Sequence, residues 1–88
     1  MVNFKIKVTD SAGLHARPAS VLSREAGKFK SDIQLEYGEK KANMKSIMGI
    51  MALGITTGKE ITIYCEGEDE QAAMTAIAEA IKVNEVGE

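Results

Sequence analysis

Alternating hydrophobic and polar residues mark three segments of the chain as strands with one buried face. In residues 2–8, 33–37 and 61–65, a hydrophobic side chain stands at every second position. Successive side chains of a strand point to opposite faces of a sheet, so this spacing predicts one buried face and one exposed face. Residues 40–44 form a shorter, charged segment, which suits the edge of a sheet. Gly38 and Glu39 lie between the second and third strands and predict a two-residue hairpin of type II′.

Helical spacing of hydrophobic residues predicts two longer helices. The first begins near Ala16 and ends at about Gly27, and its hydrophobic stripe consists of Ala19, Leu22, Ala26 and Phe29. The second follows an acidic turn at residues 66–70, whose carboxylates suit the positive end of a helix dipole. Its buried stripe consists of Ala73, Met74, Ile77, Ala80 and Ile81. The residues after Asn84 show no such pattern, and we expect this tail to be frayed.

A short helix is expected between Ser46 and Gly54. Serine is a favoured N-cap because its hydroxyl accepts a hydrogen bond from an early helical N–H, and glycine suits the other end. The hydrophobic residues between these ends are Ile47, Met48, Ile50, Met51 and Leu53. They run nearly around the whole helix, and a two-turn surface helix cannot bury all of them. We therefore expect some of them to face solvent or a partner.

The expected order of elements is β-α-β-β-α-β-α, which indicates an α+β fold in one domain spanning residues 1–88. Half-buried strands favour an antiparallel sheet whose one face is covered by helices. The hydrophobic pattern leaves the strand order open. A ferredoxin-like arrangement fits part of this order, but it requires a second long helix where the helix after Ser46 is short.

Composition narrows the classes of function. A hydrophobic content of 44% is ordinary for a globular protein, and a net charge of −2 argues against general nucleic-acid binding. The one cysteine, Cys65, alternates with Ile61 and Ile63 and is expected in the core, and no Cys/His cluster is present to hold a metal. Hydrophobic runs are far shorter than the roughly 20 residues that span a bilayer. We expect a cytoplasmic protein, monomeric and without a cofactor or membrane insertion.

Residues 13–20 carry the strongest chemical signal, because they hold the only histidine and the only proline of the chain. Pro18 suits the first turn of a helix, which places His15 at or just before the first helical residue. The N–H groups of Ala16 and Arg17 are then free, and the helix dipole favours negative charge there. A neutral imidazole is a nucleophile near pH 7. A phosphoryl group on His15 would meet these N–H groups and the Arg17 guanidinium.

A plainer interpretation is that His15 only caps the helix and that Arg17 is a solvated charge. Two longer motifs argue against it. Residues 13–19 (GLHARPA) resemble the active-site signature of HPr, the histidine-containing phosphocarrier family of the bacterial sugar phosphotransferase system. Residues 45–54 (KSIMGIMALG) resemble the regulatory serine segment of the same family. The two motifs stand at the family's usual separation, and the resemblance covers essentially the whole chain.

The resemblance implies an open-faced β-sandwich with strand order first, fourth, second, third. It also implies that enzyme I, which draws on phosphoenolpyruvate, phosphorylates His15 on Nδ1. The phosphoryl group would then pass to the enzyme IIA unit of a sugar permease, with Arg17 neutralising its charge. By this resemblance the protein is a phosphorylated co-substrate and not an enzyme.

Ser46 resembles the serine that HPr kinase/phosphorylase modifies, and the modified form would bind a catabolite control repressor. Phosphate at an N-cap is electrostatically favoured, although Ser46 is a competent N-cap without it. We also expect a surface on which partners dock. Its residues are Ile47, Met48 and Met51, flanked by Arg17, Ser20 and Arg24.

Three alternatives remain at this point. A regulatory HPr-like paralogue would lack the histidine, whereas this chain has His15. A phosphocarrier of the nitrogen branch would differ around Ser46, where this chain resembles the sugar branch. A small-ligand binding module would need a pocket, and no segment of the sequence supplies one.

Overall fold

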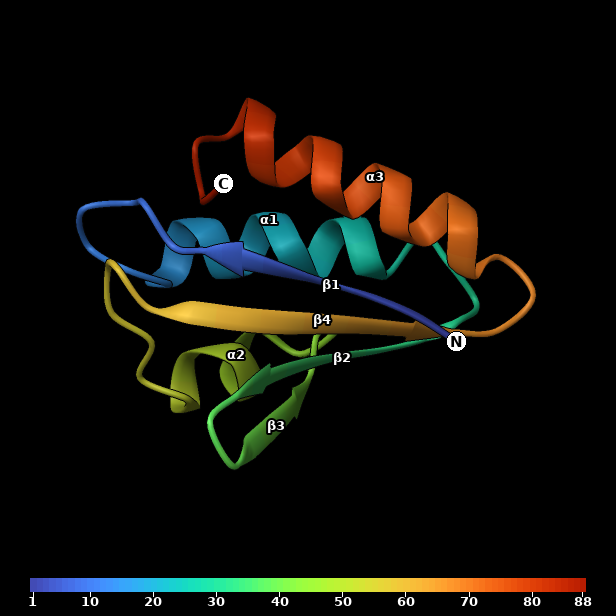
Figure 1. Ribbon diagram of the computed structural model, residues 1–88, viewed down its shortest axis with the longest axis horizontal. Coiled ribbons are helices and arrows are strands. Elements are labelled where there is room, and N and C mark those ends of the chain that lie inside the picture. The colour runs from blue at the N-terminus through green and yellow to red at the C-terminus, as the bar shows by residue number, and fades with distance from the viewer.

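The computed structural model describes residues 1–88 as a four-stranded antiparallel sheet with three helices (Figure 1). The strands are β1 (Val2–Lys7), β2 (Asp32–Tyr37), β3 (Lys40–Asn43) and β4 (Glu60–Glu66). The helices are α1 (Ala16–Ala26), α2 (Ile47–Ala52) and α3 (Glu70–Val83). This order of elements and the sheet order β1-β4-β2-β3 confirm the expected open-faced sandwich. None of the three helices combines the length and the hydrophobicity that crossing a membrane requires.

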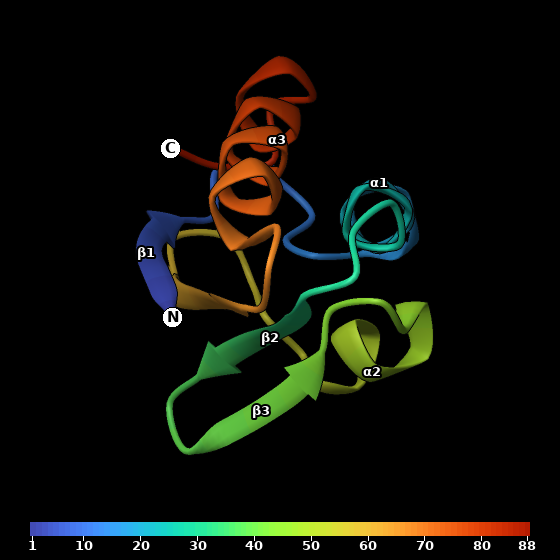
Figure 2. The same ribbon diagram turned by 90° about the vertical axis from the view of Figure 1, so that its right-hand side faces the viewer.

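The helices lie on one side of the sheet and leave its other face open (Figure 2). The two longer helices, α1 and α3, pack against each other over the sheet. The short α2 contacts α1 and the edge strand β3, so it lies at one end of the sandwich. This arrangement leaves the N-terminal end of α1 at the rim of the molecule, next to the loop that follows β1.

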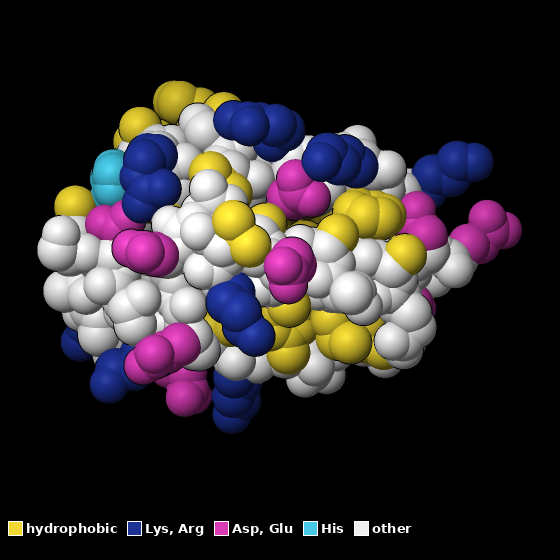
Figure 3. Space-filling model, turned by 90° about the horizontal axis from the view of Figure 1, so that it is seen from above, with side chains coloured by type: hydrophobic (Ala, Val, Ile, Leu, Met, Phe, Trp, Pro, Cys, Tyr) yellow, Lys and Arg dark blue, Asp and Glu magenta, His cyan; other side chains and the backbone are white.

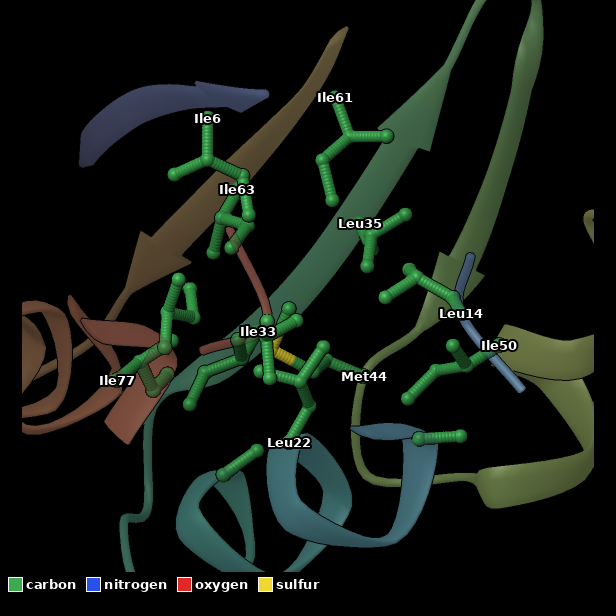
Figure 4. Close-up of a cluster of buried hydrophobic side chains, with 14 of the residues drawn as sticks. Ile6, Leu14, Leu22, Ile33, Leu35, Met44, Ile50, Ile61, Ile63 and Ile77 are labelled. Carbon is green, nitrogen blue, oxygen red and sulfur yellow. The ribbon is translucent and has the colours of Figure 1, made fainter. Parts of the chain in front are cut away.

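The core consists of the inward residues of the strands and one stripe of each helix (Figure 4). Ile33 and Leu35 of β2 and Ile63 of β4 are completely buried, which confirms the alternation read from the sequence. Leu22 of α1 and Ile77 of α3, from the helix layer, belong to the same cluster. Each such side chain contributes about 1.5–3 kcal/mol to folding. The core includes Cys65, as predicted.

The turn between β2 and β3 has the predicted hairpin geometry. Tyr37 pairs with Lys40, so two residues form the loop. Gly38 has φ +62° while Glu39 has a negative φ, which fits a type II′ turn and excludes type I′, where both values are positive.

The expectation of a frayed C-terminal tail is wrong. Val86 is fully buried, and the segment that follows it forms a bridge with the end of β1. The N–H of Lys7 donates to Glu88 O at 2.8 Å, and the N–H of Glu88 donates to Lys7 O at 2.9 Å. A Cβ atom at Gly87 would lie 2.6 Å from Lys7 O, so glycine permits this close approach. The C-terminal tail is therefore paired with the chain at the end of β1.

Candidate functional site

Three residues of the 13–19 motif fix the path of the chain into α1. Gly13 has φ +71°, and a Cβ atom there would lie 2.4 Å from Ile55 O. Leu14 donates its N–H to Ile55 O at 3.0 Å. The side chains of Leu14 and Pro18 are both buried. These contacts anchor the chain on both sides of His15, which presents its imidazole at the surface. Figure 3 shows this single histidine at one end of the molecule, beside a basic side chain.

His15 is the N-cap residue of α1, as predicted, but its side chain makes no capping hydrogen bond. The carbonyl of His15 accepts the first helical hydrogen bond, from Ala19 N at 3.0 Å. The N–H groups of Ala16 and Arg17 have no acceptor within the chain, and Pro18 has no N–H at all. Two free donors and the positive end of the helix dipole therefore lie next to a half-exposed imidazole.

Asp10, a residue of the loop between β1 and α1 for which the sequence predicted no role, lies at the centre of this site. Its Oδ1 accepts a hydrogen bond from the N–H of Ala12 at 3.0 Å and lies 3.3 Å from His15 Nε2. Its Oδ2 accepts a hydrogen bond from Nη2 of Arg17. The Ala12 N–H, with Arg17 and His15 as further causes, lowers the pKa of the Asp10 carboxyl below its usual range. The side chain is thus a carboxylate at neutral pH.

The Arg17 guanidinium is held by two contacts. Besides the contact with Asp10, its Nη1 donates to Asn84 O at 3.4 Å, at the C-terminal end of α3. Beside Arg17 lies an open hollow of about 650 Å³ with no hydrophobic lining residue. The residues that line it are Thr9, Asp10, Ser11, Arg17, Lys82, Glu85, Gly87 and Glu88. The C-terminal segment thus forms part of the surroundings of Arg17.

Ser46 is the N-cap of α2, as predicted, and its Oγ accepts a hydrogen bond from Gly49 N at 3.0 Å. The residue before it links α2 to the first helix. Ser23 Oγ of α1 donates to Lys45 O at 2.8 Å, and Lys45 Nζ donates to Phe29 O at 2.9 Å. The residue before Ser46 is therefore hydrogen-bonded to α1 and to the turn that follows it.

The hydrophobic residues of α2 divide into a buried and an exposed set. Ile50 is fully buried and Leu53 nearly so, whereas Ile47, Met48 and Met51 are 40%, 79% and 43% exposed. We call these three exposed residues the α2 patch. Arg24 is exposed and Ser20 is half-buried on α1, the helix that α2 contacts. The predicted exposure is confirmed, while docking of a partner stays a prediction.

In this two-layer α+β sandwich, the start of α1 brings together a half-exposed histidine, free helical N–H groups and an arginine, a set of groups that can stabilise an anion. A family model described as "PTS HPr component phosphorylation site" matches residues 2–83. The chain belongs to this family, the HPr phosphocarriers of the phosphotransferase system. It is 51% identical to the phosphocarrier protein HPr of Mycoplasma capricolum over 81 residues, which cover 92% of this chain and 91% of that protein.

Two solved structures place the fold in the same family. The histidine-containing phosphocarrier protein of Mycoplasma superposes with a TM-score of 0.96 at 46% identity, covering 99% of both chains. Crh, the catabolite repression protein of Bacillus subtilis, superposes with a TM-score of 0.73 at 46% identity, covering 94% of this chain and 95% of that one. Crh was solved as a domain-swapped dimer.

Proposed function

We propose that this chain accepts a phosphoryl group from enzyme I on Nδ1 of His15 and passes it to the enzyme IIA unit of sugar permeases. The observation that supports the proposal most directly is the start of α1. There the free N–H groups of Ala16 and Arg17, the helix dipole and a guanidinium surround a half-exposed imidazole. Such a set stabilises added negative charge by about 1–3 kcal/mol. This modest stabilisation suits a carrier, which must release its cargo.

We further propose that the partners dock on the α2 patch. Enzyme I and enzyme IIA must both reach His15, and the α2 patch offers hydrophobic surface on the neighbouring helix. Methionine side chains adapt to different surfaces, which suits a patch that serves several partners in turn. Arg17, Ser20 and Arg24 flank the patch in this scheme. The protein acts as a single cytoplasmic domain, residues 1–88, and as a monomer.

Ser46 has a regulatory role in this scheme. HPr kinase/phosphorylase would modify its hydroxyl, and the product would bind a catabolite control repressor. The support is the N-cap position, since a phosphate there lies at the positive end of the α2 dipole. A purely regulatory member of the family would need Ser46 and not His15. Phosphorylation of the protein by enzyme I therefore separates the two functions.

The test is phosphorylation by enzyme I and phosphoenolpyruvate, followed by mass measurement of the intact protein. We expect one added phosphoryl group that acid removes, and we expect His15→Ala to accept none while retaining its fold. Ser46→Ala is the matched control and should be phosphorylated as fast as the wild type. Undiminished labelling of His15→Ala would contradict the proposal, and so would an unlabelled wild type.

A further inference from the structure

Asp10 contacts both residues that the proposed function assigns to phosphoryl transfer. Oδ1 lies 3.3 Å from Nε2 of His15, and Oδ2 accepts a hydrogen bond from Arg17. The Asp10 side chain is only 10% exposed, and its Oδ1 also accepts a hydrogen bond from the N–H of Ala12. The carboxylate is therefore held where it contacts both side chains.

The position of this carboxylate decides which nitrogen of His15 is the nucleophile. A neutral imidazole carries one proton, and the nitrogen without it keeps the reactive lone pair. A carboxylate only accepts hydrogen bonds, so it favours the tautomer with the proton on the nitrogen that faces it. Nε2 faces Asp10. The lone pair then remains on Nδ1.

We propose that Asp10 is a positioning residue of the phosphoryl transfer, which holds the His15 proton on Nε2 and so directs the phosphoryl group to Nδ1. This inference depends on the proposed function of His15.

In the transfer, the Nδ1 lone pair forms the bond to phosphorus while the bond between phosphorus and the donor atom breaks. The electron pair of that bond leaves with the donor. No proton leaves the ring, so the ring gains positive charge, which the Asp10 carboxylate offsets. Carboxylates that orient catalytic histidines act in the same way.

Asp10 also keeps Arg17 near the start of α1. The guanidinium has five N–H donors, and the contacts with Asp10 and Asn84 O use two of them. The other donors can bind phosphate oxygens while Asp10 still holds the side chain. Removal of the carboxylate should therefore release Arg17 as well as the imidazole.

The first measurement is the tautomer of His15 in the unphosphorylated, full-length protein, by ¹⁵N NMR above the pH at which the ring is protonated. We expect the Nε2–H tautomer to dominate in the wild type. In Asp10→Ser the two tautomers should become comparable, because the shorter, uncharged hydroxyl can still accept from the Ala12 N–H but cannot reach Nε2. Asp32→Asn, which alters an exposed carboxylate on β2, is the control and should match the wild type.

The second measurement is phosphorylation by enzyme I. In Asp10→Ser we expect kcat to fall at least about tenfold with a smaller change in KM, and ³¹P NMR to detect phosphate on Nε2 as well as on Nδ1. Asp10→Asn keeps Oδ1, which accepts from the Ala12 N–H and faces Nε2, but it removes the negative charge and the Oδ2 acceptor for Arg17. A merely structural role therefore predicts wild-type kinetics for Asp10→Asn, whereas our inference predicts a loss of kcat that is smaller than in Asp10→Ser. A wild-type ratio of tautomers in Asp10→Ser, or wild-type kcat in both variants, would overturn the inference. If the wild type accepts no phosphoryl group, the proposed function fails, and the tautomer measurement still decides whether Asp10 orients His15.

Discussion

At the scale of single residues, Asp69 shows how one carboxylate can join two distant loops. It is the N-cap residue of α3, yet its side chain does not cap that helix. Instead it accepts hydrogen bonds from Lys30 N at 2.8 Å, from Ser31 N at 2.9 Å and from the Ser31 hydroxyl. The Ser31 hydroxyl and the Lys30 N–H lower the pKa of the Asp69 carboxyl below its usual range. These bonds attach the chain after α1 to the start of α3.

This pKa predicts an acid-dependent loss of stability. Because the folded-state pKa of Asp69 is lower than the unfolded value, its stabilisation is present above that value and is lost as the pH falls below about 4. Asp69→Asn should be less stable than the wild type at pH 7, and its free energy of unfolding should change less between pH 4 and pH 2. Ser31→Ala, which removes one of the three donors, should lie between them. Urea denaturation at a series of pH values measures this, and a wild-type slope in Asp69→Asn would contradict it.

At the scale of elements, α3 ends in a Schellman motif built on a residue that does not suit it. The N–H of Val86 donates to Ile81 O at 2.9 Å, and the N–H of Glu85 donates to Lys82 O at 3.2 Å. This pattern requires a left-handed residue after the cap, and Glu85 has φ +56°. Glycine is usual at this position because a Cβ atom makes the conformation costly.

We therefore expect Glu85→Gly to stabilise the protein by about 1 kcal/mol, which raises the Tm of a domain of this size by about 4–8 °C. Glu85→Ala is the matched control, since it removes the charge but keeps the Cβ atom. Thermal unfolding followed by circular dichroism tests both variants. A gain in Glu85→Ala equal to that in Glu85→Gly would assign the effect to charge instead of backbone conformation.

The α2 patch carries a prediction that separates docking from packing. Met48 is 79% exposed, so Met48→Asp should leave Tm nearly unchanged. If enzyme I covers the patch, the same change buries a charge in the complex and should weaken binding about tenfold or more. Gln71→Glu, on the exposed side of α3, adds one negative charge away from α2 and should bind normally. Isothermal titration calorimetry gives the affinities for enzyme I. Equal affinity of Met48→Asp and the wild type would show that enzyme I does not dock on Met48.

The elements were predictable from the sequence where hydrophobic periodicity marks them, and less so where single polar residues act at long range. Alternation located the strands, and Pro18 with the apolar stripe after it located the start of α1. The contacts of Asp10 were not predictable, because its approach to His15 and Arg17 depends on the path of a polar loop. The C-terminal pairing was missed for a related reason. A single hydrophobic residue, Val86, is too short a pattern to predict a strand pairing.

At the scale of the whole molecule, the two motifs lie on neighbouring helices that are tied together. Ser23 of α1 binds the carbonyl of Lys45, directly before Ser46. The Gly49 N–H that Ser46 Oγ now binds can serve a phosphate equally well, so phosphorylation should leave α2 intact. Any effect of Ser46 on His15 should therefore arise from charge at the docking surface, and not from a change of fold.

We expect phosphorylation of Ser46 to slow the phosphorylation of His15 by enzyme I. The phosphate adds about −1.5 to −2 charges beside the α2 patch, and this charge must lose water or face carboxylates of the partner when the complex forms. A penalty of about 2–3 kcal/mol would weaken binding about thirty- to more than a hundredfold. Because the mechanism is electrostatic, the inhibition should diminish as salt is added. Ser46→Asp should show a weaker inhibition, and Ser46→Ala should transfer normally but escape regulation.

The measurement is enzyme I kinetics on modified and unmodified protein at low and high salt. Equal KM and kcat for the two forms would exclude the coupling, and inhibition that salt does not relieve would indicate a conformational change instead.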